Sequence, residues 1–175
     1  MTTASVHPAV ESIIPTVHLI KGYYRNMLDG VTPETFAQRP DGVLTNHPAY
    51  IFGHVAFYSN KIMNAFGAGD DLFSDEHEAV YQMNVECSDA ADGATYLSMD
   101  ESQRVFETVM DQVIERLPKV EASALDAPPT GSSFEGLMPT MGGVANFVLV
   151  AHPMAHAGQF SAWRRCMGLG PAALR

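Results

Sequence analysis

Apolar side chains recur every three or four positions in four stretches of the chain, and this spacing is typical of amphipathic α-helices. The predicted helices span residues 8–28, 47–66, 101–117 and 141–167. No alternating pattern of the kind that marks a half-buried β-strand competes with them. The sequence therefore predicts an all-α protein built from four long helices.

The ends of these helices carry residues that commonly cap helices. Asn46 is the expected N-cap of the second helix, and Pro48 lies in its first turn, where a missing amide proton is harmless. Ser98 and Glu101 match a capping box before the third helix. Gly168 is the expected stop of the fourth helix.

The second and third helices are separated by a long stretch, residues 68–97, which is rich in Asp, Glu, Gly and Ala. Antiparallel neighbours in a bundle do not need so long a connection. It can run the whole length of a bundle and allow the second and third helices to lie parallel. We therefore expect a four-helix bundle with a long crossover between these two helices.

Composition fits one globular domain over residues 1–175, since 46% of the residues are hydrophobic and 17% are charged. The formal net charge of −10 disfavours a nucleic-acid partner. The N-terminus does not resemble a secretory signal, and the most apolar stretch, residues 142–151, is too short to cross a bilayer. Cys87 and Cys166 show no metal-type spacing and are expected to be ordinary thiols. We expect a cytoplasmic protein with no membrane partner.

Two histidines, His152 and His156, stand one helical turn apart in a largely apolar part of the fourth helix. Burying two polar imidazoles side by side costs free energy unless something satisfies them, and a divalent metal ion would do so. Pro153 lies between them, where the zincin protease signature requires glutamate, so a protease of that type is not expected. This proline leaves the Leu149 carbonyl without its usual amide partner and should bend the helix.

A third histidine, His54, lies on or beside the apolar stripe of the second helix. Alone, it is more typical of a core histidine that bonds to a carbonyl or a tyrosine. Together with the pair, it would supply three protein ligands and leave an open position, which is the catalytic arrangement. Two alternatives stay open at this point: a metal-binding or stress-response protein without catalysis, and a structural bundle whose histidines need no metal.

Two blocks of the sequence resemble the DinB-like (YfiT-like) family of metalloenzymes. Residues 46–57 are similar to the family's second helix with its Gly-His ligand motif, here Gly53 and His54. Residues 151–168 are similar to its His-x-x-x-His-x-Gly-Gln block, followed by an arginine and a Leu-Gly-type ending. The resemblance covers essentially the whole chain and implies the same bundle topology.

The resemblance implies that His54, His152 and His156 bind a divalent metal, which in that family is variously zinc, nickel, iron or manganese. Zinc or nickel is the first expectation here. It also implies a homodimer and a small-molecule substrate. Metal-bound hydroxide would support hydrolysis, and a coordinated low-molecular-weight thiol would support thiol transfer. Tyr58 lies one turn beyond His54 and is a candidate donor to a metal-bound oxygen, although a core tyrosine that bonds to a carbonyl is the more common case. Gln159 is a candidate for support of a ligand or for contact with the substrate, although helix packing explains it as well.

Overall fold

The computed structural model describes residues 6–172, and within that range it contains helices and no strands. The long helices are α1 (Pro8–Met27), α3 (Pro48–Ala65) and α5 (Met99–Arg116). A fourth long segment consists of α7 (Met141–Asn146), the π-helical η2 (Phe147–Ala151) and α8 (His152–Cys166). The all-helical prediction is confirmed, and each of the four predicted helices begins and ends within two residues of an observed segment.

Shorter helices that periodicity did not predict lie in the connections. They are α2 (Pro33–Phe36), α4 (Asp75–Tyr81), η1 (Leu117–Lys119) and α6 (Ala122–Asp126). Each has only one or two turns, so none presents an apolar stripe that a periodic pattern could reveal.

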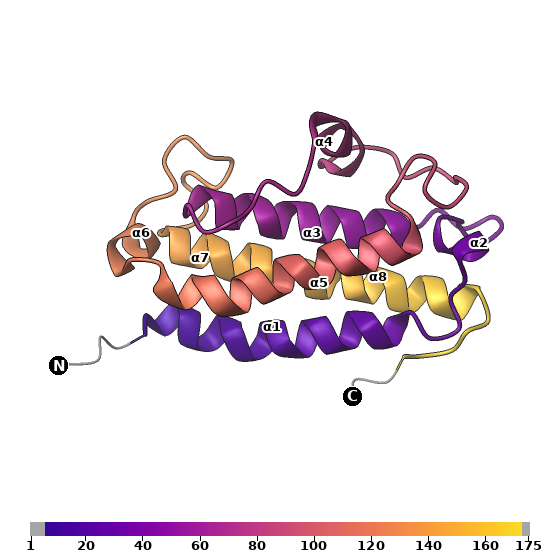
Figure 1. Cartoon of the computed structure of the whole chain (residues 1–175), viewed down its shortest axis with the longest axis horizontal. Coiled ribbons are helices and arrows are strands. Elements are labelled where there is room, and N and C mark those ends of the chain that lie inside the picture. The colour runs from indigo at the N-terminus through magenta and orange to yellow at the C-terminus, as the bar shows by residue number, and fades with distance from the viewer. Residues whose placement is uncertain (1–5, 173–175) are drawn as a thin grey trace.

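The four long segments lie side by side along the longest axis of the molecule (Figure 1). Helix α3 packs against α5 and α8, and α1 packs against the same two helices. The stretch after α3 passes over the outside of the helices through α4 and returns to the end where α3 begins (Figure 1). Helices α3 and α5 therefore run in the same direction.

The interior is formed by the side chains that the helical spacing places inward, including Ile13, Val17, Phe106 and Val113. None of the helices within residues 6–172 is long and apolar enough to span a membrane.

The N-cap of α3 is His47, which corrects the prediction of Asn46. The Nδ1 atom of His47 accepts a hydrogen bond from the Tyr50 amide at 3.2 Å, and its Nε2 donates to the Ser88 carbonyl at 2.9 Å. Asn46 instead donates from Nδ2 to Oε1 of Gln159 at 3.0 Å. It therefore joins the start of α3 to α8 rather than capping α3.

Pro153 coincides with a change of helix type rather than with the end of a helix. Proline has no amide hydrogen, so the Leu149 carbonyl loses its usual partner. The backbone widens into the π-helix η2 at this point, and the His152 amide bonds to the Phe147 carbonyl five residues earlier. The Pro153 carbonyl accepts a hydrogen bond from the buried Tyr24 hydroxyl at 2.7 Å. The widened turn comes directly before His152 and sets where α8 presents this side chain.

Candidate metal centre

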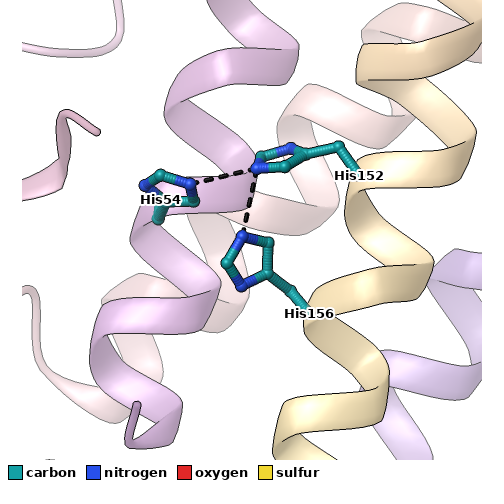
Figure 2. A group of neighbouring side chains, drawn as sticks. All are labelled: His54, His152 and His156. Carbon is teal, nitrogen blue, oxygen red and sulfur yellow. Dashed lines mark hydrogen bonds between the residues drawn. The ribbon is translucent and has the colours of Figure 1, made fainter. Parts of the chain in front are cut away.

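Three histidine rings from two neighbouring helices face one another (Figure 2). His54 lies in the middle of α3, whereas His152 and His156 lie one turn apart on α8. The Nε2 atom of His152 is 3.0 Å from that of His54 and 3.1 Å from that of His156. Among the described residues, these three side chains form a group whose candidate ligand atoms all lie within 4.8 Å of one another.

The outward-facing nitrogens of two rings are held by oxygen acceptors. Nδ1 of His54 lies 2.7 Å from the Tyr81 carbonyl oxygen, and Nδ1 of His156 lies 2.9 Å from Oε1 of Gln159. Because these oxygens only accept, each Nδ1 carries the hydrogen and each Nε2 presents a lone pair to the centre. Asn46 donates to the same Gln159 oxygen, which fixes the orientation of that amide.

The third ring, that of His152, lies between two lone pairs. If its Nε2 carries a hydrogen, that hydrogen can be donated with good geometry to only one of the other two Nε2 atoms at a time. Its Nδ1 is buried and has no hydrogen-bond partner within the described part of the chain. Hydrogen bonding therefore leaves this cluster incompletely satisfied, whereas one cation at its centre would engage all three Nε2 atoms.

The spacing of the nitrogens fits a shared ion. Three nitrogens bound tetrahedrally at about 2.1 Å from one zinc ion lie about 3.4 Å apart. The observed separations of 3.0 and 3.1 Å are a few tenths of an ångström shorter. Small ring movements therefore suffice for these residues to hold a divalent metal.

Burial keeps all three rings neutral at pH 7. It lowers the pKa of His54 to about 4, with a smaller effect from the nearby His156. It lowers the pKa of His152 to about 3, with further contributions from His156 and His54. The pKa of His156 is also lowered by burial, against the opposing effect of its hydrogen bond to Gln159. Neutral imidazole is the form that binds metals, so little proton release is needed on binding.

Tyrosine side chains lie beside two of the three rings, those of His54 and His152. Tyr50 stacks on His54, with ring centroids 5.1 Å apart. The Tyr58 ring lies edge-on at 4.9 Å from His54 and 5.7 Å from His152. The Tyr58 hydroxyl accepts a hydrogen bond from the Met83 amide at 2.9 Å, which leaves its own hydrogen free to be donated.

The structure thus brings all five residues singled out in the sequence into one place, with Tyr58 beside the three rings and Gln159 bonded to His156. Sequence reasoning missed the Tyr81 carbonyl that holds His54. A backbone carbonyl leaves no mark in the identity of its residue, so no sequence signal could have indicated it. Asn46 was noticed only as a cap, although its amide bonds to Gln159.

Comparison with known proteins adds one match. The family model described as the DinB superfamily matches residues 21–160, which include α3, α5, α7 and all three clustered histidines. Neither the curated proteins nor the solved structures include one that is significantly similar to this chain. Since the matched region covers most of the chain and contains both histidine-bearing blocks, we conclude that the chain belongs to the DinB superfamily.

Proposed function

We propose that this protein is a cytoplasmic, metal-dependent enzyme that binds a divalent ion through His54, His152 and His156 and acts on a small molecule. The observation that carries the proposal is the convergence of three Nε2 atoms while the Nδ1 atoms of His54 and His156 bond to oxygen acceptors. Imidazole ligands suit zinc and nickel, with iron or manganese as alternatives.

Neutral ligands decide what such a centre can do. A divalent ion held by three neutral imidazoles keeps its full charge and an open position, and it lowers the pKa of a coordinated water or thiol. The protein's own side chains would bind and orient the substrate beside that position. Tyr58 is the candidate donor to a substrate oxygen, because Met83 occupies its acceptor side and leaves its hydrogen available. Gln159 would keep His156 in the binding tautomer.

A groove that Tyr58 separates from the three histidines supports a small-molecule substrate. It has a volume of about 320 Å³ and shares Tyr58 with the surroundings of the histidines. Its walls are mostly apolar and include Ile62, Val144 and Val148, while Lys61 and two serines supply polar groups. Cavities of this size with a few polar groups suit small organic ligands.

The reaction that we propose is either hydrolysis or transfer of a low-molecular-weight thiol to an electrophile. Both reactions need an activated nucleophile at one open position and no additional general base from the protein. The unpaired cysteines, Cys87 and Cys166, are not among the clustered groups, so a reacting thiol would come from solution.

Activity screening tests this proposal. Ester, amide and thiol-conjugation substrates would be offered to the metal-loaded wild type and to His156→Ala. We expect turnover that EDTA abolishes and that falls at least about 100-fold in the variant, because one metal ligand is lost. Equal rates for both proteins would remove the catalytic claim.

We also propose that the arrangement of α1, α3, α5 and α7–α8 is a DinB-like four-helix bundle with a long crossover, and that two copies form a homodimer. Phe147 and Met154 support a partner surface, because these large apolar side chains are 39% and 42% exposed. Light scattering that gives the mass of a single chain at micromolar concentration would contradict the dimer.

A further inference from the structure

The last residue of α4, Tyr81, and the two residues that follow it, Gln82 and Met83, lie against α3 beside the three histidines. We call them the strap. Three α3 side chains spaced four residues apart, and so on one face of the helix, each contact one backbone group of the strap. These contacts are His54 Nδ1 to the Tyr81 carbonyl at 2.7 Å, the Tyr50 hydroxyl to the Gln82 carbonyl at 3.4 Å, and the Met83 amide to the Tyr58 hydroxyl at 2.9 Å.

The strap lies this close to α3 because residue 53 is glycine. A Cβ atom at Gly53 would lie 2.0, 2.1 and 2.6 Å from three ring atoms of Tyr81. The Tyr81 ring therefore packs directly on the α3 backbone, where it is fully buried. Its hydroxyl accepts a hydrogen bond from the Leu97 amide at 2.8 Å, which holds the far end of the ring. Glycine at position 53 thus allows the Tyr81 carbonyl to come close enough to α3 to accept the hydrogen bond from His54.

We propose that the strap positions a ligand of the metal centre, and that Gly53 allows the strap to pack against α3. This inference rests on the proposed function, because it assigns a role toward the bound ion. The Tyr81 carbonyl selects the His54 tautomer that has its hydrogen on Nδ1, and so presents the Nε2 lone pair to the ion. The Met83 amide orients the Tyr58 hydroxyl on the same side of α3.

Docking of the strap and binding of the ion must then favour each other. The ion binds only the His54 tautomer that the docked strap selects, so the bound ion raises the occupancy of the docked state. Such coupling is reciprocal. The factor by which the bound ion favours the docked strap equals the factor by which the docked strap strengthens metal binding, so a change that displaces the strap should weaken metal binding.

The substitution Gly53→Ala tests the coupling, because the added methyl group would displace the Tyr81 ring without changing a ligand. We expect zinc to bind about 10- to 100-fold more weakly, as is typical when a partner that orients a histidine ligand is lost. Gly22→Ala is the matched control, since it adds the same methyl group to helix α1 with nothing within 4 Å. Its zinc affinity should equal that of the wild type.

Amide hydrogen exchange on the wild type provides a second measurement that holds even if Gly53→Ala fails to fold. Adding zinc should slow exchange at the Met83 amide, which bonds to Tyr58. It should leave the Ala94 amide unchanged, because that amide bonds to Ala91 in a separate turn of the same connection. Equal slowing at both amides, or unchanged affinity in a folded Gly53→Ala, would overturn the role of the strap alone. A wild type that binds no zinc, nickel, iron or manganese would overturn the proposed function and this role together.

Discussion

Acid should destabilise the metal-free protein through His54, and burial of this ring sets the size of the effect. Burial lowers its pKa from 6.5 to about 4, so between these values the unfolded chain binds a proton that the folded ring does not. The contribution of His54 to the free energy of unfolding is therefore complete above about pH 6.5 and is lost as the pH falls toward about 4. Between about pH 7.5 and pH 5, the shift corresponds to a loss of about 2 kcal/mol in the free energy of unfolding.

Urea unfolding in the presence of EDTA measures this loss when wild type is compared with His54→Asn. Asparagine keeps a side-chain N–H for the Tyr81 carbonyl but has no group that titrates. Carboxylates that titrate over the same range are present in both proteins, so their contribution cancels in the difference. We expect the pH dependence of the variant to be smaller by about 2 kcal/mol. Identical pH dependence would refute the assignment of His54 as a buried, neutral ring.

Three further predictions concern the support of the ligands, the proline in the fourth long segment and the bound ion. Gln159→Leu removes the acceptor of His156 Nδ1 and should weaken zinc binding about 10- to 100-fold in a competition titration; unchanged affinity would mean that this bond orients nothing. Tyr24→Phe leaves the Pro153 carbonyl without its buried donor and should lower the free energy of unfolding by about 1–3 kcal/mol in urea; full wild-type stability would contradict this. Free zinc at 100 times its dissociation constant should stabilise the protein by about 2.7 kcal/mol in thermal melts, and EDTA should reverse the gain. A melting temperature that changes with neither zinc nor EDTA would argue against a site present only in the folded state.

The sequence predicted the long helices and the histidine pair because both are local patterns. His152 and His156 are neighbours on any helix that contains them, whatever that helix packs against. The meeting of His54 with the pair depends on how α3 packs against α8, which residue spacing does not encode. Its place on the apolar stripe made His54 a candidate, and the resemblance to a family then implied that it is the third ligand. The capping error at Asn46 was avoidable, because proline favours the first helical position, and Pro48 therefore pointed to His47 as the cap.

Other features arise only from tertiary packing. Arg164 is 2% exposed, and it donates to the carbonyls of Met27 and Asp29, at and just after the end of α1. The Tyr81 carbonyl reaches His54 because a ring packs against a glycine on another helix. Such contacts link residues far apart in the chain and have no periodic signal.

The central claim is that imidazoles from two helices hold one ion, and elemental analysis tests it most directly. Untagged wild type, His54→Ala and His18→Ala would be loaded with zinc or nickel, desalted and analysed for metal. His18 is exposed on α1 and serves as the matched control. The account predicts about one ion per chain in the wild type and in His18→Ala, and little or none in His54→Ala. Metal-free wild type, or full metal content in His54→Ala, would contradict it.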